Sequence, residues 1–284
     1  MVFVYIRIVR IMPTYLGQHF LKNKKTVGNI ITALAIKPGE TVIEIGPGKG
    51  ALTAGLLRAV AAADGKLIVI EIDRDLAVAI HEKYAGDPHL TIVNGDALTE
   101  LSGIVAPLSE GAHKIVGNIP YYITGKLLRT IGDLAIKPER TILMIQKEVA
   151  ERVAALPPKM NLLAAAVRRW ADPKLLLTLT PDNFDPPPDV HSAVIMLQTR
   201  AQAKNECTDA DYYRLLHIIF KQPRKTLLNN LADSLHLSKQ ELERLIGTLG
   251  YDVKTRPQEL SVDRIDALAT LLKDKKIEIT PNHP

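Results

Sequence analysis

Residues 41–145 alternate between two patterns of apolar and polar positions. Short β-branched, apolar runs predict five strands: 41–45, 66–72, 90–95, 114–118 and 140–145. Helical patterns lie between several of these runs: 51–62, 74–85 and 124–133. Strands that alternate with helices indicate βαβ units, and continuous apolar strands indicate a sheet covered on both faces. The pattern therefore predicts an α/β domain with a mainly parallel sheet.

Two later apolar runs, 174–180 and 191–199, are joined by a segment too rich in proline to form a helix. Because no crossover helix separates them, we expect these two strands to pair antiparallel at an edge of the sheet. Residues 209–273 show helical periodicity and no convincing strand. The expected N-caps in this region are Asp209, Ser238 and Ser261.

These changes of pattern predict three parts of the chain: an N-terminal extension over 1–15, an α/β domain that carries the chemistry over 16–200, and a small helical domain over 206–284. Met12 is an alternative start, which would place 1–11 outside the native protein. The first residues are too short an apolar run for a membrane span and lack the features of a signal peptide. We therefore expect a cytoplasmic protein without a membrane partner.

The composition, 46% hydrophobic and 24% charged, is that of a globular protein and excludes a disordered or collagen-like chain. Cys207 is the only cysteine, which excludes a disulfide scaffold and fits a reducing compartment. The eight histidines show no metal-ligand spacing. No metal is expected.

The net charge of +5 is concentrated at one end of the chain. Residues 1–36 contain five basic and no acidic residues, so the remainder, with 31 of each, sums to zero. A basic segment favours a polyanionic partner such as nucleic acid. For any single lysine or arginine, a solvated surface position is the alternative.

The segment IEIGPGKG, 43–50, ends a strand in a glycine-rich turn that leads into a helix. Gly46, Gly48 and Gly50 let a ligand approach the backbone, and the helix N-terminus favours negative charge. A tight turn without a ligand is the alternative. The spacing differs from the dinucleotide fingerprint G-x-G-x-x-G, although Ala51 in a loosened third position leaves a nicotinamide enzyme open.

Acidic residues follow the next two strands. Glu71 lies about 20 residues beyond the glycines, where a carboxylate can accept from ribose hydroxyls, and Asp73 follows it. Asp96 belongs to the same carboxyl edge of the sheet, where it can accept from an adenine amino group or cap the next helix. The alternative for the first pair is solvated charges in a loop. Together with the glycine-rich turn, these residues indicate a nucleoside cofactor.

The segment GNIPYYI, 117–123, is the most informative one. Asn118 supplies a carbonyl acceptor, Pro120 restricts the neighbouring backbone, and Tyr121 supplies an aromatic face. Two acceptors beside a stacking surface suit a planar amine, which is the arrangement that methyl transfer to an exocyclic base amine needs. A strand-ending turn with a core tyrosine is the alternative.

Nine motifs occur in order along the chain: GQHFL (17–21), EIGPGKG (44–50), EID (71–73), GDAL (95–98), NIPYYI (118–123), QKEVAERVAA (146–155), FDPPPDVHSAV (184–194), PRKTLLNNL (223–231) and RPQELSVDRI (256–265). In combination they resemble the small-subunit ribosomal RNA adenine dimethyltransferases. The resemblance implies a Rossmann-like class I methyltransferase fold with S-adenosylmethionine as cofactor. It implies transfer to the 6-amino groups of two adjacent adenines in a 3′ hairpin of small-subunit rRNA, a role in small-subunit biogenesis, and the pre-small-subunit particle as partner. We expect a monomer.

The resemblance also implies roles for individual residues. At the cofactor it places His19, Leu21, Gly46, Glu71, Asp96 and Asn118. At the target adenine it places Asn118, Pro120, Tyr121 and Phe184, with Phe184 stacking on the flipped base opposite Tyr121. The family usually has asparagine where His19 stands, and a Tyr-Gly-x-Leu-Ser segment where this chain has residues 159–163.

Basic residues near the expected site are the candidates for RNA contacts: Lys22, Lys24, Lys25, Lys147, Arg152, Arg224 and Lys225, with Arg168 and Arg169 as further candidates. Arg224 and Lys225 are expected to open a helix.

Three alternative functions fit the sequence less well. A nucleic-acid-binding factor of the same fold need not keep Gly46, Glu71, Asp96 and Asn118, which are all present. The segments at 146–155 and 223–231 favour the small-subunit enzymes over the related large-subunit rRNA methyltransferases. A nicotinamide dehydrogenase gives no role to the Asn-Ile-Pro-Tyr sequence. The sequence therefore favours an rRNA adenine dimethyltransferase.

Overall fold

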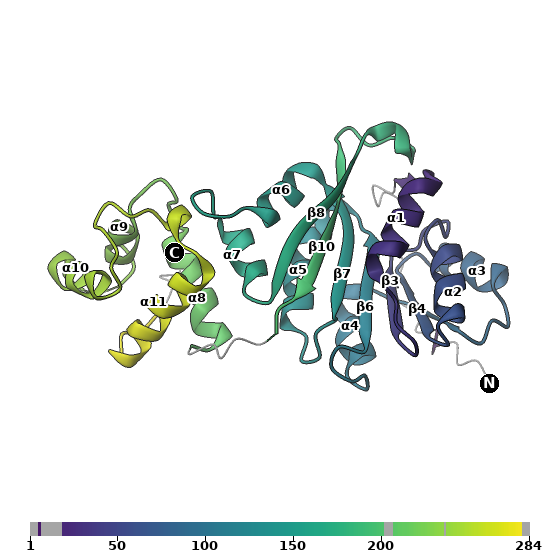
Figure 1. Cartoon of the computed structure of the whole chain (residues 1–284), viewed down its shortest axis with the longest axis horizontal. Helices are drawn as coiled ribbons and strands as arrows, with labels where there is room; N and C mark the ends of the chain where they lie inside the picture. The colour runs from purple at the N-terminus through teal and green to yellow at the C-terminus, as the bar shows by residue number, and fades with distance from the viewer. Residues whose placement is uncertain (1–4, 7–18, 202–206, 236, 280–284) are drawn as a thin grey trace. The chain divides into compact units, whose positions relative to one another are not determined.

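The computed structural model describes residues 5–6, 19–201, 207–235 and 237–279 (Figure 1). The expected extension over 1–15 and the alternative start at Met12 lie almost entirely outside the described residues. The chain divides into two compact units, Met1–Glu151 with Asp172–Thr199 and Arg152–Ala171 with Arg200–Pro284. Residues 152–171, which the sequence pattern placed in the α/β domain, thus belong to the helical unit, because their apolar side chains join its core.

In the described part of the first unit, eight strands form one sheet in the order β1-β5-β4-β3-β6-β7-β10-β8 (Figure 1). Their bounds are Tyr5–Ile6 (β1), Thr41–Ile45 (β3), Lys66–Glu71 (β4), Leu90–Asn94 (β5), His113–Asn118 (β6), Arg140–Gln146 (β7), Ala171–Leu179 (β8) and Ser192–Thr199 (β10). Strands β3 to β7 pair in parallel, β10 pairs antiparallel with β7, and β8 lies at the edge beside β10. The predicted mainly parallel sheet with an antiparallel edge is confirmed.

Helices cover this sheet, as the apolar strands predicted. Their bounds are Lys24–Leu34 (α1), Thr53–Ala62 (α2), Arg74–Lys83 (α3), Ala97–Val105 (α4), Thr124–Asp133 (α5) and Lys147–Ala154 (α6), with a 3-10 turn at Tyr121–Ile123 (η1). Ile30 and Leu34 of α1 and Leu56 of α2 share a core cluster with Val42 and Val69 of the sheet. All five residues of β3 are buried, because side chains on both of its faces are covered.

A second, two-stranded sheet lies at the site end of this unit. Strand β2 (Phe20–Leu21) pairs antiparallel with β9 (Phe184–Asp185), which follows the 3-10 turn η2 (Pro181–Asn183). The Lys22 amide donates to the Asn183 carbonyl at 2.9 Å, and the Asn23 side chain donates to that of Asn183 at 2.7 Å. This pairing holds Phe20 and Leu21 beside Asp185 and Phe184, which open the motif at 184–194.

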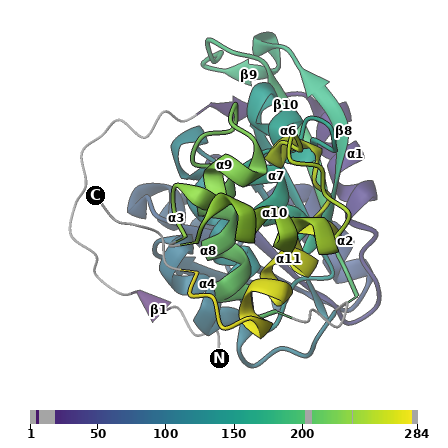
Figure 2. The same cartoon turned by 90° about the vertical axis from the view of Figure 1, so that its left-hand side faces the viewer.

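The second unit contains the remaining helices: Leu162–Arg168 (α7), Asp209–Ile219 (α8), Leu227–Ala232 (α9), Lys239–Thr248 (α10) and Val262–Asp274 (α11), with a 3-10 turn at Pro257–Glu259 (η3) (Figure 2). Ser238 and Ser261 are N-caps, as predicted. The N-cap of α8 is Thr208 and not Asp209, because the Thr208 hydroxyl accepts from the Asp211 amide.

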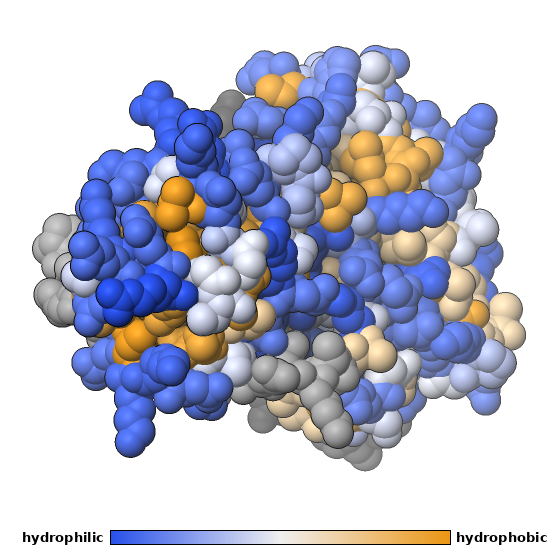
Figure 3. Space-filling model, turned by 60° about the vertical axis from the view of Figure 1, so that its left-hand side comes forward, coloured by the Kyte–Doolittle hydropathy of each residue, from blue (hydrophilic) through white to orange (hydrophobic). Residues whose placement is uncertain are grey.

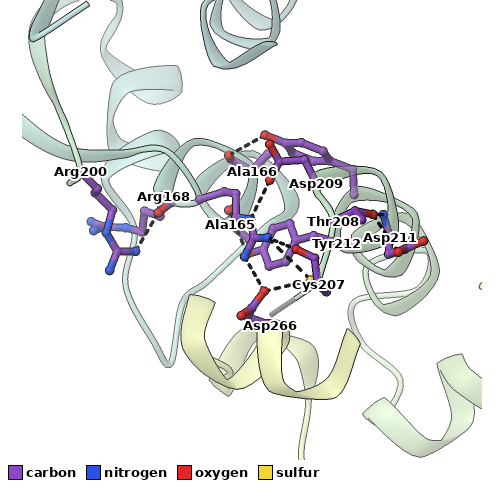
Figure 4. A network of polar contacts seen from close by, with 12 residues as sticks. Ala165, Ala166, Arg168, Arg200, Cys207, Thr208, Asp209, Asp211, Tyr212 and Asp266 are labelled. Atoms are coloured by element: carbon purple, nitrogen blue, oxygen red, sulfur yellow. Dashed lines mark hydrogen bonds and ion pairs between the residues drawn. The ribbon is translucent and has the colours of Figure 1, made fainter. Parts of the chain in front are cut away.

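Two expectations about basic residues in the second unit are wrong. Arg224 and Lys225 precede α9, whose N-cap is Thr226, so they do not open that helix. Arg169 is not a surface cation, since its side chain is 2% exposed and pairs with Asp209 and Asp266, which are labelled among the polar contacts in Figure 4. The Arg169 guanidinium also donates to the Cys207 carbonyl at 3.0 Å and lies over the Tyr212 ring at 4.4 Å.

On the face drawn in Figure 3, hydrophilic side chains predominate and apolar residues form separate groups. The large apolar side chains that are exposed include Ile72, Tyr122 and Leu156. Scattered exposed apolar residues are ordinary for a folded protein. Among the described residues, none of the helices has the length and apolar character that a membrane crossing needs.

Candidate active site

The carboxyl ends of the parallel strands bring the predicted site residues together. Ile45, the last residue of β3, pairs with Ile70 of β4 on one side and with Gly117 of β6 on the other. The segments that follow these strands are therefore neighbours, at the edge where parallel α/β sheets bind their ligands. The glycine-rich turn, Glu71 and Asn118 meet at this edge.

The glycine-rich turn needs glycine because of its backbone angles. Gly46, Gly48 and Gly50 have φ of 63°, 55° and 80°, in the left-handed region that other residues rarely adopt. The Gly46 amide donates to the Ile70 carbonyl at 2.9 Å, which ties the turn to β4. A Cβ atom added at Gly48 would lie 2.7 Å from the Phe20 ring. At Gly46, by contrast, the one neighbour within 4 Å of an added Cβ would be the Asn118 carbonyl oxygen, at 3.7 Å, so this glycine leaves bare backbone beside Asn118.

Glu71 supports this turn from the end of β4. Its side chain is buried, and its two carboxylate oxygens accept from the Gly48 amide at 3.1 Å and from the Asp73 amide at 3.0 Å. Burial raises the pKa of Glu71, and these two hydrogen bonds act in the opposite direction. Each carboxylate oxygen has a further lone pair for a ligand hydroxyl. Asp73 itself is the N-cap of α3.

Asp96 is the N-cap of α4, and its Oδ1 accepts from the Leu98 amide at 2.9 Å. The capping alternative is thus confirmed. Capping uses one carboxylate oxygen and leaves Asp96 at the carboxyl edge, after β5. Its contact with an adenine stays a prediction.

Glu44 is a site residue to which the sequence analysis gave no role. It lies within β3, two residues before Gly46, and is 1% exposed. Burial raises its pKa to about 8, and the nearby charge of Glu71 acts in the same direction. Its Oε2 has no hydrogen-bond partner among the described residues. The available signal was a single acidic residue inside an apolar strand.

Asn118 and Tyr121 stand at the end of β6 in fixed orientations. The Asn118 side-chain Nδ2 donates to the His19 carbonyl at 2.8 Å, which leaves Oδ1 as the acceptor end of the amide. Pro120 has φ of −57° and precedes η1. The Tyr121 hydroxyl lies 2.8 Å from the Ser192 hydroxyl at the start of β10. The sequence motif did not indicate this contact with Ser192.

His19 occupies the space beside the Tyr121 ring. The two rings are stacked, with centroids 6.2 Å apart and planes at 27°, and His19 Nδ1 lies 2.8 Å from the Pro186 carbonyl. Phe184 and Leu21 are buried, at 1% and 5% exposed, and belong to the core of the first unit. Phe184 therefore presents no open ring face in this structure.

Several of the predicted RNA-contact residues are exposed. Lys22, Lys24 and Lys25 surround the N-cap Asn23 of α1 and are all exposed, as are Arg152 and Arg224. Lys147 lies 3.7 Å from Glu151, and Lys225 lies 2.8 Å from Asp233. Lys49, which the sequence analysis did not single out, lies over the Phe20 ring at 4.6 Å. Within the part of the chain that the structure describes, no cluster of three or more His, Cys, Asp or Glu residues is arranged for a metal ion.

The strand order, the glycine-rich turn and the acidic residues that follow β4 and β5 define a Rossmann-like, S-adenosylmethionine-dependent methyltransferase. A model of the family described as ribosomal RNA adenine dimethylase matches residues 12–272. The chain therefore belongs to the ribosomal RNA adenine dimethylase family.

Individual relatives agree with this family. The chain is 37% identical over 253 residues to ribosomal RNA small subunit methyltransferase A of Dehalococcoides mccartyi, a match that covers 87% of this chain and 84% of the relative. It is also 37% identical over 264 residues to the protein of the same name from Parasynechococcus marenigrum, covering 89% and 84%. A crystal structure of a dimethyladenosine transferase from Plasmodium falciparum has a TM-score of 0.76 and 25% identity, covering 91% of this chain and 99% of that one.

Proposed function

We propose that this protein transfers methyl groups from S-adenosylmethionine to the 6-amino group of adenine in small-subunit rRNA, giving dimethyladenosine. The observation that carries the proposal is the fixed Asn118 amide beside the Tyr121 ring, next to a bare glycine-rich turn. Membership of the rRNA adenine dimethylase family and the two named relatives support the RNA substrate. The substrate site is, in this proposal, two adjacent adenines in a 3′ hairpin.

The residues at the carboxyl edge fit the cofactor. Bare backbone at Gly46 accommodates a closely approaching ligand, and Glu71 retains acceptor capacity for ribose hydroxyls. Asp96 would hold the adenine, and Leu21 and the His19 segment would hold the methionine end. When bound, S-adenosylmethionine supplies an electrophilic methyl group.

The protein's own groups would orient the target amine. Asn118 Oδ1 accepts one N–H of the 6-amino group, and a backbone carbonyl accepts the other. The Pro120 carbonyl already accepts from the Ile123 amide at 3.2 Å, so the Ile119 carbonyl is the better second acceptor. With both hydrogens held, the nitrogen lone pair faces the methyl group, and orientation supplies much of the acceleration.

The target adenine must leave its RNA stack to reach these groups, at a cost of a few kcal/mol. Stacking on Tyr121 returns about 1–3 kcal/mol. Stacking on Phe184 as well requires this buried ring to become accessible when RNA binds. Because His19 already lies against Tyr121, we propose that the histidine ring moves aside for the base.

The exposed lysines that follow β2 would contact RNA phosphates: Lys22, Lys24 and Lys25. Arg152 and Arg224 would add contacts from the second unit, whereas Lys147 and Lys225 already have acidic partners. The proposed setting is the cytoplasm, with the pre-small-subunit particle as partner. The monomeric state stays a prediction.

The deciding experiment is mass analysis of both ribosomal RNAs from cells that lack the gene. We expect dimethyladenosine to disappear from small-subunit rRNA and to return when the wild-type gene is restored. Purified protein with S-adenosylmethionine should then restore it on particles from those cells. Dimethyladenosine that persists in small-subunit rRNA, or a loss confined to large-subunit rRNA, would overturn the proposal.

A further inference from the structure

A cleft of about 390 Å³ opens in the first unit, at the start of β10 and α6. Its volume is within the range of small-ligand pockets, roughly 300–1,000 Å³. The described residues that line it are Gln146, Lys147, Glu148, Glu151, Val190 and His191. The function proposed above assigns no role to this cleft.

This cleft adjoins the groups that would hold the target amine. Gln146 of β7 pairs with Ser192 of β10, and Ser192 holds the Tyr121 hydroxyl at 2.8 Å. In the same strand Met144 pairs with Asn118 of β6. Gln146 therefore lies on the strand next to Asn118, two residues further along than Met144, and paired strands are about 4.8 Å apart. The cleft is therefore where a nucleotide adjacent to the target adenine would lie.

The charges that line the cleft favour a base over a phosphate. Lys147 is 3.7 Å from Glu151, so its charge is already offset, and Glu148 adds a second carboxylate. His191 apart, the one lysine and two glutamates that line the cleft sum to −1, which disfavours a phosphate. A carboxylate instead accepts from the exocyclic amino group of a base, and a glutamine amide both donates and accepts. Val190, 42% exposed, offers an apolar surface to the base.

We propose that this cleft binds the nucleotide next to the target adenine and selects a base with an amino group, with Glu148 as the acceptor. The inference rests on the proposed function, because it needs an RNA adenine as the target. Adenine, cytosine and guanine satisfy Glu148, because each carries an exocyclic amino group. Uracil presents a carbonyl oxygen, which the carboxylate repels. Glu148 is thus a specificity residue, and it takes no part in the methyl transfer.

The test uses the full chain and small-subunit particles reconstituted with rRNA in which the target adenine is kept. The nucleotide on each side of it is changed in turn to adenine, cytosine or uracil. Methyl transfer (kcat/KM) and the Kd of the particle are measured for wild type, Glu148→Ala and Glu82→Ala. Glu82 is an exposed glutamate near the end of α3, so Glu82→Ala removes the same charge away from the cleft.

We expect uracil on one side to lower the wild-type kcat/KM and weaken the binding about tenfold relative to cytosine, as loss of one base contact does, and cytosine is the reference because a neighbouring adenine can itself be a target. Glu148→Ala should lose this discrimination, and Glu82→Ala should retain it. If transfer occurs but wild type and Glu148→Ala discriminate equally, or neither discriminates on either side, the inference is wrong and the proposed function stands. No transfer to any particle, the unaltered one included, would instead overturn the proposed function and the inference with it.

Discussion

The two ends of strand β3 hold buried carboxyl groups in opposite surroundings. At its amino end Glu40 and Glu139 pair with the buried Lys114, whose Nζ lies 3.1 Å from Glu139. Burial opposes ionisation there, yet hydrogen bonds from Lys37 and Lys114 hold the pKa of Glu139 at about 2. At the carboxyl end, burial raises the pKa of Glu44 to about 8, and one of its oxygens has no partner among the described residues.

The contrast shows how one strand serves two purposes. At the amino end the charges satisfy one another and stabilise the fold, although both ring nitrogens of the neighbouring His113 lack hydrogen-bond partners among the described residues. At the carboxyl end Glu44 Oε2 is buried without a partner among the described residues, and the oxygens of Glu71 and Asn118 keep acceptor capacity that a ligand can use. Without a ligand, the unpartnered oxygen of Glu44 lowers the stability of the folded protein. Four substitutions test this comparison.

The largest effect is expected from Asn118→Ala, at the carboxyl edge of the sheet. The variant loses the acceptor that orients the target amine, and loss of one such group costs about 10²–10³-fold in rate. We expect kcat/KM to fall about 10³-fold in a methyl-transfer assay with small-subunit particles. Affinity for S-adenosylmethionine, measured by calorimetry, should change little. Turnover equal to that of wild type would refute the orienting role of Asn118.

At the amino end of β3, a substitution should change the free energy of unfolding and not the activity. Lys114→Met leaves Glu40 buried beside an apolar side chain, and removal of one partner of a buried pair costs about 3–5 kcal/mol. We expect urea unfolding to report a loss of this size, with kcat/KM of the folded protein unchanged. The control is Lys37→Met, because the Lys37 side chain is 61% exposed and solvent screens its pair with Glu139, which should therefore contribute far less. Equal losses in the two variants would contradict the conclusion that the buried Lys114 pairs stabilise the fold.

The smallest effects concern pH, and they have opposite signs. Glu44 has a folded pKa of about 8 against an ordinary value of 4.5, so the folded state binds more protons between these values. Stability without cofactor should therefore fall as pH rises from 4.5, by on the order of 3 kcal/mol at pH 7. Glu44→Gln should remove this slope in urea unfolding curves at several pH values.

His113, which begins β6 and pairs with Thr41 at the amino end of β3, should give stability the opposite dependence on pH. Burial lowers its pKa from 6.5 to about 4, so the unfolded state binds more protons between these values. Stability should fall as pH falls from 6.5, by roughly 2 kcal/mol at pH 5. His113→Leu should remove only this acidic slope. A variant that changes both slopes would show that the two ends are coupled.

Local pattern was sufficient for much of this protein. The period of the apolar residues indicated the strands and helices, because burial on a sheet or on a helix face repeats with the local geometry. Positions at the carboxyl ends of parallel strands then placed Gly46, Glu71, Asp96 and Asn118 at one edge, since parallel strands end together. The sequence motifs in combination indicated the family.

Only the tertiary structure decided how distant segments complete the site. The pairing of β2 with β9 brings His19 against Tyr121 and buries Phe184, and no local periodicity encodes that contact. Burial likewise turned Arg169 from an expected RNA contact into part of an internal network, and left Glu44 without a partner for one oxygen within the described chain. The physical reason is that side-chain surroundings depend on chain segments far apart in sequence, whereas periodicity reports only neighbours along the chain.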